Sequence, residues 1–477
     1  MTSKTNADIV DTVPHAVTEW DRIPAKRYYD PDFYELENKN LWPRVWQMAC
    51  RLEEIPEVGD YTVYRNLDQS IIVIRTGADT IKAYHNHCRH RGVELVNKNG
   101  KATGGFICPF HGWRWDREGN NTFVFQEDAY SEANMCKDDL ALRDVRCDTW
   151  GGCAWINLDK DAPPLYESLG RFAKQMDLYK VDELQVEWWY AARLPTNWKL
   201  AMEAFMEGYH VATTHPQLLP PGATSRPGEA AWVKLPPEMI MGSWWTTMPP
   251  KMPEEIDSGM FIDNYIDKMN ELHEGMGGML AKEEIAVAER LRNTELPRNT
   301  QDALITWRRM LNQAMTDDYR GKGIEIGDLN AIDAAGEASS VNFCFPHYFL
   351  LPVHGAASSY RIRPLGPEEC LFELWSLKRY PKDEKRPVPT APTPKAHDDP
   401  QWPEIPKQDY SNLPRQQRGL HTGDFEFMRI SKDMEGLISN YQRLIDGYLA
   451  GYPSDKLVDA VQEVSGPIDR AVEDLGF

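Results

Sequence analysis

Short apolar runs in the first third of the chain predict β-strands rather than helices. Each run combines β-branched or aromatic side chains and is bounded by polar or glycine-containing turns, which is typical of antiparallel strands. The runs are residues 61–65, 70–75, 81–84, 113–115 and 151–157. We therefore expect a small antiparallel β domain, which we assign to residues 45–162.

The rest of the chain is patterned differently. Apolar residues recur there at intervals of three and four, which places them on one face of a helix. Three such sets are Phe261, Tyr265, Met269 and Leu272; Leu304, Trp307, Leu311 and Met315; and Leu437, Tyr441, Leu444 and Tyr448. Strands are predicted again at 359–363 and 370–378. Residues 381–406 contain eight prolines and predict an extended surface loop.

These patterns predict a second, α+β domain with an antiparallel sheet, formed by residues 1–44 and 163–477. We expect a helical insertion at residues 230–335. The formal net charge of −20 and the sequence pI near 5.1 argue against a general binder of nucleic acids or anionic membranes. The first 20 residues do not resemble a signal peptide, and no run is long enough to span a membrane, so a soluble, cytoplasmic protein is expected.

Two of the eight cysteines are paired with histidines. The first pair is Cys88 and His90, and the second, after a 17-residue interval, is Cys108 and His111. A zinc site with two cysteines and two histidines would suit these ligands, but zinc fingers usually do not mix the two residue types within each half. A [2Fe–2S] cluster accommodates mixed halves when both thiolates bind one iron and both imidazoles bind the other.

The spacing Cys-x-His-x17-Cys-x2-His, with Cys-Pro-x-His-Gly-Trp in its second half, resembles a Rieske iron–sulfur domain. This resemblance implies that Cys88 and Cys108 hold one iron and that His90 and His111 hold the other. Neutral imidazoles in place of thiolates raise the potential of such a cluster, which relays one electron at a time.

A second group of metal-competent residues lies between positions 203 and 215. If the segment is helical, Glu203, Glu207 and His210 fall within about 60° of one another on one face. Pro216 disfavours helical geometry at His215, so the chain can turn there and bring both imidazoles to one ion. Two histidines and a carboxylate on one side of Fe(II) leave positions open for O₂ and substrate.

This segment resembles the mononuclear-iron motif in the large (alpha) subunits of Rieske non-haem iron aromatic-ring-hydroxylating oxygenases. The resemblance implies a helix-grip catalytic domain in which His210 and His215 bind Fe(II). Glu207 occupies the position of a bridging acid, usually Asp, that links an iron-bound histidine to a cluster histidine of the neighbouring subunit. The third ligand is expected to be Asp409, with Asp398, Asp399 and Asp424 as alternatives.

By this resemblance the chain is a terminal oxygenase that hydroxylates a hydrophobic substrate, aromatic or polycyclic, by mono- or dioxygenation. Its electrons would come from an NAD(P)H-dependent reductase, with or without a ferredoxin. The family forms trimers of alpha subunits, with or without small beta subunits. The chain lacks Gly-x-Gly-x-x-Gly, so the reductase is expected to be a separate chain.

Two alternatives remain from the sequence. One is a Rieske-type electron-transfer protein without mononuclear iron, and the other is a monooxygenase or demethylase acting on a quaternary amine, a group in which Glu is found at the bridging position. A methionine- and tryptophan-rich segment between 232 and 315 could line a hydrophobic pocket, or could form core or a trimer contact. Its residues include Met239, Met241, Trp244, Trp245, Met248, Met252, Met260, Phe261, Met269, Met276 and Met279.

Overall fold

The computed structural model describes residues 7–218, 233–234, 247–248 and 254–477. Its first large sheet lies within the predicted β domain and has seven strands in the order β2-β11-β10-β5-β4-β3-β6, all antiparallel. The strands are β2 (Gln47–Arg51), β3 (Asp60–Asn66), β4 (Gln69–Gly77), β5 (Thr80–His85), β6 (Gly100–Lys101), β10 (Asp144–Trp150) and β11 (Cys153–Asn157). The predicted strands at 61–65, 70–75 and 81–84 are confirmed, and the strand predicted at 151–157 begins at Cys153, after a turn at Gly151 and Gly152.

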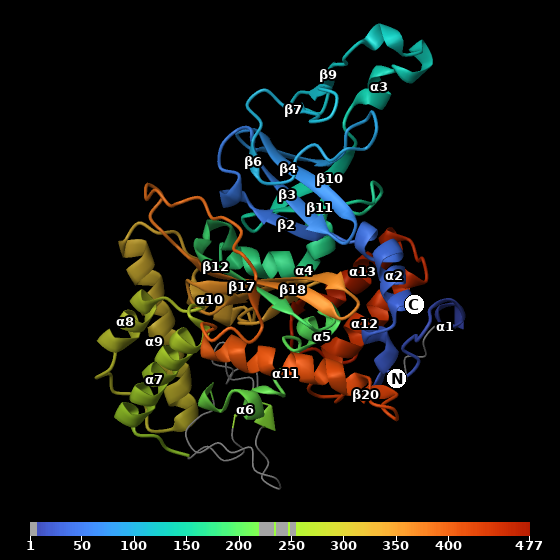
Figure 1. Cartoon of the computed structure of the whole chain (residues 1–477). Coiled ribbons are helices and arrows are strands. Elements are labelled where there is room, and N and C mark those ends of the chain that lie inside the picture. The colour runs from blue at the N-terminus through green and yellow to red at the C-terminus, as the bar shows by residue number, and fades with distance from the viewer. Residues whose placement is uncertain (1–6, 219–232, 235–246, 249–253) are drawn as a thin grey trace.

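A three-stranded sheet of β7 (Phe106–Ile107), β8 (Arg114–Trp115) and β9 (Asn121–Phe123) packs against this sheet. Buried aromatic side chains join the two, including Tyr84, Phe106 and Trp115. The three-stranded sheet and the short α3 (Lys137–Leu140) lie at one extreme of the molecule, at the top of Figure 1.

The second large sheet also has seven strands, in the order β19-β12-β18-β17-β16-β15-β21. Its strands are β12 (Gln185–Leu194), β15 (Asn342–Cys344), β16 (Tyr348–Pro352), β17 (Ala357–Gly366), β18 (Glu369–Lys378), β19 (Lys395–Ala396) and β21 (Gly466–Pro467). All neighbours are antiparallel except β12 and β19. The α+β fold class is therefore confirmed.

Helices surround the second sheet. They are α1 (Ala7–Thr12), α2 (Pro31–Asn40), α4 (Leu165–Leu178), α5 (Trp198–Glu203), α6 (Val211–Thr214), α7 (Ser258–Met276), α8 (Lys282–Arg290), α9 (Thr300–Gly321), α10 (Leu329–Ala334), α11 (Glu404–Leu420), α12 (Gly436–Leu449) and α13 (Ser454–Val464). The helices predicted from apolar spacing correspond to α7, α9 and α12. Two short pairings complete the fold: β1 (Arg22–Pro24) with β20 (Phe427–Arg429), and β13 (Val233–Lys234) with β14 (Thr247–Met248).

Helices α5 and α11 position the second candidate site. Helix α5 contacts β17 and β18, and α11 contacts both α5 and β12. Figure 1 shows α11 and α6 on the side of the second sheet that faces away from the first sheet. The two candidate metal sites therefore lie on opposite sides of the second sheet.

The proline-rich segment ends earlier than predicted. Residues 381–394 contain no helix or strand, but β19 begins at Lys395 and α11 begins at Glu404. Pro406 lies in the first turn of α11, where a helix has no partner for the missing N–H, so this proline is compatible with a helix start. No helix in the described ranges is long and apolar enough to cross a bilayer. The domain boundaries at 44/45 and 162/163 remain predictions.

Candidate functional site

Two loops of the same construction carry the cysteine and histidine pairs. The first follows β5 and the second follows β7. In each loop the cysteine N–H donates to a carbonyl five residues later, Cys88 to Val93 at 2.7 Å and Cys108 to Trp113 at 2.8 Å. The turns close at Gly92 and Gly112, whose φ angles of +76° and +73° favour glycine. The repeated geometry presents one thiol and one imidazole from each loop.

The tips of the two loops meet. The Nδ1 atoms of His90 and His111 lie 3.2 Å apart, and the His90 ring stacks on Trp113 with 4.9 Å between ring centroids. Cys88 and Cys108 are both buried, each 2% exposed. The structure therefore brings the two loops together, with His90 against His111 and the Cys88 thiol near the Cys108 thiol, and the histidines lie nearer the surface than the cysteines.

The surroundings of these loops favour the neutral forms of the Cys88 thiol and the His90 imidazole. Burial raises the pKa of the Cys88 thiol, and the nearby Cys108 thiol raises it further. Burial lowers the pKa of His90, and His111 and Arg91 lower it further. A neutral imidazole can donate its nitrogen lone pair to a metal, and bound metal favours deprotonation of a thiol. The donor set fits a cluster with two sulfur and two nitrogen ligands.

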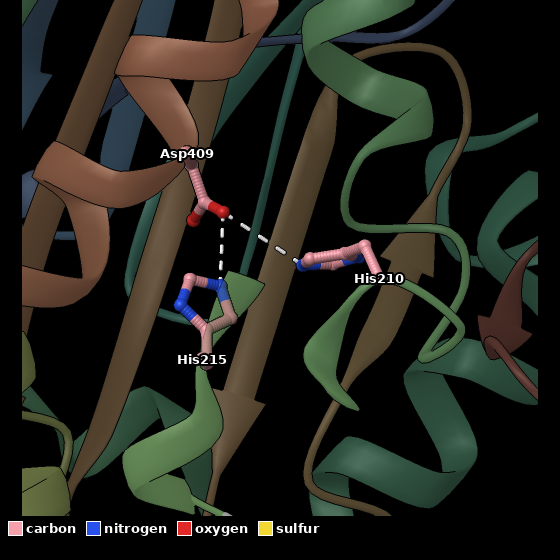
Figure 2. Close-up of side chains that lie close together, drawn as sticks. All are labelled: His210, His215 and Asp409. Atoms are coloured by element: carbon pink, nitrogen blue, oxygen red, sulfur yellow. Dashed lines mark ion pairs between the residues drawn. The ribbon is translucent and has the colours of Figure 1, made fainter. Parts of the chain in front are cut away.

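The second site joins residues from two distant segments. In Figure 2, Asp409 from α11 faces His215 at the end of α6 and His210 just before it. Asp409 Oδ1 lies 2.9 Å from His215 Nε2 and 3.7 Å from His210 Nε2. One ligand atom from each of the three residues lies within 4.8 Å of the others. The arrangement fits one metal ion with two nitrogen ligands and a carboxylate.

The segment that carries these histidines is not one continuous helix, which a shared face of Glu203, Glu207 and His210 would require. Helix α5 ends at Glu203, residues 204–210 form turns, and α6 begins at Val211. Gly208 lies in this break. The expectation at Pro216 is fulfilled, because the helix ends at Thr214 and His215 has the non-helical angles φ −121° and ψ 58°.

The break separates Glu203 from the metal-competent residues. Glu203 is buried and accepts hydrogen bonds from the Tyr28 hydroxyl at 2.9 Å and from Gln442. The prediction that Glu203 shares a face with Glu207 and His210 was therefore wrong. A helical projection assumes unbroken dihedral angles, and it cannot anticipate the turn between α5 and α6.

Glu207 is hydrogen-bonded twice to His210. Its Oε1 lies 2.7 Å from His210 Nδ1, and its Oε2 accepts from the His210 backbone N–H at 3.0 Å. Burial lowers the pKa of His210, but Glu207 and Asp409 outweigh that effect and raise the pKa from its ordinary value. With Nδ1 directed at Glu207, Nε2 of His210 is left to face Asp409.

Asp409 is the carboxylate that the fold brings to the histidines. Its side chain is 4% exposed, in a cavity wall that also contains His210 and His215. The alternatives Asp398 and Asp424 are exposed, and Asp399 accepts a hydrogen bond from the Gln401 N–H in a local turn. None of these three belongs to the metal-competent group.

A cavity with mainly apolar walls adjoins the metal-competent group. Its apolar lining includes Phe205, Leu272, Met276, Val341, Leu351 and Ile405. Of the methionines predicted to line a pocket, Met276 and Met279 do so, Met269 is buried in the core, and Met260 is exposed. Met239, Met241, Trp244, Trp245 and Met252 lie outside the described residues.

Sequence reasoning missed two glutamines beside the second site. Gln408 precedes Asp409 on α11 and contacts His215, while Gln217 follows Pro216 and contacts Gln408. Their only sequence signal is position, because each lies within two residues of a predicted ligand. Glutamine is common on helix surfaces, and its residue type alone does not indicate a role at a metal.

Family models match both parts of the chain that carry these candidate sites. The family model of the Rieske [2Fe–2S] domain matches residues 45–129, and that of the ring-hydroxylating alpha subunit (catalytic domain) matches residues 181–451. These two matches support the two predicted cofactors, a [2Fe–2S] cluster and a mononuclear iron.

Curated relatives match part of the chain. It is 31% identical over 199 residues to the 2-aminobenzenesulfonate 2,3-dioxygenase subunit alpha of an Alcaligenes species, covering 41% of this chain and 50% of the relative. It is 30% identical over 196 residues to the carnitine monooxygenase oxygenase subunit of Escherichia coli strain K12, covering 41% and 52%. The chain thus spans about half the length of the curated relatives it matches.

Solved structures match over more of the chain. Naphthalene 1,2-dioxygenase with indole bound in the active site aligns with a TM-score of 0.61 at 18% identity, covering 95% of this chain and 99% of that one. A quaternary ammonium Rieske monooxygenase in complex with gamma-butyrobetaine aligns with a TM-score of 0.57 at 17% identity, covering 93% and 99%. These similarities are evidence of fold. Since the catalytic-domain model matches more than half of the residues and follows a Rieske domain, this chain belongs to the family of ring-hydroxylating oxygenase alpha subunits.

Proposed function

We propose that this protein is the terminal oxygenase of a multicomponent Rieske oxygenase. In this proposal Cys88 and Cys108 hold one iron of a [2Fe–2S] cluster, and His90 and His111 hold the other. His210, His215 and Asp409 hold a mononuclear Fe(II). The observation that carries the proposal is the convergence of these last three side chains at the wall of an apolar cavity.

The three-residue group suits oxygen chemistry. Two imidazoles and one carboxylate occupy one side of an Fe(II) ion and leave its other positions for O₂ and substrate. When bound, the iron would supply O₂ activation, with electrons reaching it through the cluster. Glu207 orients one ligand by accepting a hydrogen bond from His210 Nδ1. The apolar side chains of the cavity wall restrict the access of water to the ligands.

We infer a hydrophobic substrate, aromatic or polycyclic, from the cavity. Its walls are dominated by aliphatic side chains and methionines, which adapt to flat or irregular apolar molecules. The charged residues of the lining, apart from those beside the metal-competent histidines, are Lys268 and Asp469.

A quaternary amine is the second candidate substrate. It is favoured by Glu207 at the bridging position and by the similarity to relatives named for carnitine and glycine betaine. A quaternary ammonium group is usually recognised by several aromatic faces. Among the described lining residues the aromatic side chains are Phe205 and Tyr360. We therefore favour the hydrophobic substrate.

Electron delivery in this proposal needs a second copy of the chain. The loop after β7 lies near the top of Figure 1, and the loop after β5 meets it through the contact of His90 with His111. Helices α6 and α11 lie near the bottom, with both large sheets between them and these loops. A cluster at those loops is far from the iron of the same chain. We infer a trimer, with or without beta subunits, in which Glu207 of one subunit faces the cluster ligand His111 of the next. A separate NAD(P)H-dependent reductase, directly or through a ferredoxin, would reduce the cluster.

Metal and sulfide analysis tests this proposal. The purified protein should contain about three irons and two acid-labile sulfides per chain, as one [2Fe–2S] cluster and one mononuclear iron require. Two irons and two sulfides would instead support the electron-transfer protein, and one zinc without visible absorption would exclude both. An oxygen-consumption screen with a matched reductase would then compare aromatic, polycyclic and quaternary amine substrates.

A further inference from the structure

Gln408 makes the shortest side-chain hydrogen bond to His215. The Gln408 Oε1 atom lies 2.6 Å from His215 Nδ1, on the side of the ring opposite the nitrogen that faces Asp409. His215 is 3% exposed, so this bond is shielded from water. A buried ring nitrogen bonded to an amide oxygen must carry the proton, since the oxygen can only accept.

The Gln408 amide is paired with a second glutamine. Gln217 Nε2 donates to Gln408 Oε1 at 2.9 Å, and Gln408 Nε2 returns a longer bond to Gln217 Oε1 at 3.3 Å. Turning the Gln408 amide over would place two N–H groups against each other. The pair therefore opposes a turn of the Gln408 amide alone. A metal on His215 Nε2 leaves the ring proton at Nδ1, which requires the oxygen of Gln408 on that side.

The Gln217 backbone is itself anchored. Its carbonyl accepts from the Lys268 ammonium on α7 at 2.8 Å. Lys268 also contacts Glu271 at 2.5 Å. Gln217 therefore contacts Lys268 on α7 and Gln408 on α11, so the amide pair lies between two helices. A metal ligand that must be placed precisely needs a rigid support of this kind.

We propose that Gln408 is a positioning residue for the mononuclear iron: its amide oxygen holds His215 in the tautomer protonated at Nδ1 and directs Nε2 to the ion. This inference rests on the proposed function of His210, His215 and Asp409 as iron ligands. The two imidazoles then have different supports. A carboxylate, Glu207, accepts from His210, whereas a neutral amide accepts from His215.

The support has a consequence for iron affinity. In the other neutral tautomer of His215 the proton is on Nε2, where it would have to be removed before a metal could bind. Without the Gln408 oxygen, His215 can adopt either neutral tautomer and its ring can rotate. Removing such a hydrogen-bond partner of a metal ligand typically weakens metal binding by about 10- to 100-fold. Helix α11 would therefore supply a ligand and a ligand support at consecutive positions, Asp409 and Gln408.

Substitution of Gln408 in the full-length protein tests the proposal. Gln408→Leu removes the acceptor at similar size, Gln408→Glu keeps an acceptor oxygen, and Gln416→Leu is the control at an exposed position of the same helix. Each protein, depleted of the mononuclear iron but retaining the cluster, is titrated with Fe(II) against a competing chelator. Electron paramagnetic resonance of its nitric oxide complex reports the symmetry of the iron site, and the reduced-cluster signal reports an intact fold.

We expect Gln408→Leu to bind Fe(II) about 10- to 100-fold more weakly with a changed nitric oxide spectrum. Gln408→Glu should recover most of that affinity, and Gln416→Leu should match the unsubstituted protein. Unchanged affinity and spectrum in Gln408→Leu would overturn the proposal, as would equal losses in Gln408→Leu and Gln408→Glu. If the unsubstituted protein itself binds only the cluster irons, the proposed function fails instead.

Discussion

Glu207 accepts two hydrogen bonds from His210, one from its backbone N–H at 3.0 Å and one from its ring Nδ1 at 2.7 Å. The pairing orients the imidazole and places a carboxylate within the wall of two cavities, one of which also contains the exposed Tyr209. An acid in this position can support the iron ligand and also contact a neighbouring subunit, which is the bridging role we propose for it.

Glu207→Gln tests whether Glu207 bridges to a neighbouring subunit in addition to supporting His210. The amide retains an oxygen acceptor for His210 but loses the charge, so both metal centres should remain and transfer between them should slow. We expect a decrease of about 10- to 100-fold in single-turnover electron transfer from the reduced cluster, followed by freeze-quench spectroscopy. Glu404→Gln, at an exposed position of α11, is the control. Electron transfer at the unsubstituted rate in Glu207→Gln would exclude the bridging role.

Asp409→Asn should remove the mononuclear iron. An amide is a weaker ligand than a carboxylate for Fe(II), and the substitution removes the negative charge that faces both histidines at 2.9 and 3.7 Å. Iron content should fall from about three to about two per chain while the cluster absorption is retained. Asp424→Asn, at an exposed alternative from the sequence, should keep all the iron. Loss of iron in both variants would contradict the assignment of Asp409.

Cys108→Ser should remove the cluster. Serine lacks the soft thiolate that an iron–sulfur cluster requires, and the position is buried, with Cys108 only 2% exposed. We expect loss of visible absorption and of acid-labile sulfide. Cys136→Ser is the matched control, because Cys136 is exposed and lies outside the two loops. A full complement of sulfide in Cys108→Ser would show that the cluster is held elsewhere.

The two cysteine- and histidine-containing loops could be predicted because, in each loop, the two residues lie within three positions of each other in the sequence. Cys88 and His90 share one turn, as do Cys108 and His111, and the spacing alone distinguishes this arrangement. The short strands that carry the loops were also predictable, since β-branched and aromatic side chains cluster in them. Helices α7, α9 and α12 followed from apolar spacing for the same local reason.

The geometry of the second site depended on tertiary contacts. His215 and Asp409 meet because α5 and α11 pack against the same sheet, and no pattern within either segment specifies that distance. The break after Glu203 and the helix beginning at Glu404 were both missed, because the residues there have mixed preferences that packing decides. Gln408 was missed because its role arises only from its contact with His215.

Glu203, excluded from the metal site by that break, is predicted to make stability depend on pH. Burial raises the pKa of its carboxyl to about 7, against the lowering effects of Gln442 and Tyr28. Its ordinary value is 4.5, so between these two values the folded protein holds a proton that the unfolded chain has released. The contribution of the protonated Glu203 carboxyl to the free energy of unfolding is therefore lost as the pH rises from 4.5 through about 7, because the ionised carboxylate would have to stay buried.

Glu203→Gln tests this sign. Glutamine is neutral at every pH and can still accept from the Tyr28 hydroxyl, so the variant should gain stability relative to the unsubstituted protein as the pH rises. We expect the difference in free energy of unfolding to grow by up to about 3 kcal/mol between pH 4.5 and pH 8, measured by denaturant titration at several pH values. Glu404→Gln, which is exposed, should show no such change. A pH-independent difference between Glu203→Gln and the unsubstituted protein would mean that the Glu203 carboxyl titrates at its ordinary value of 4.5 in the folded state as well.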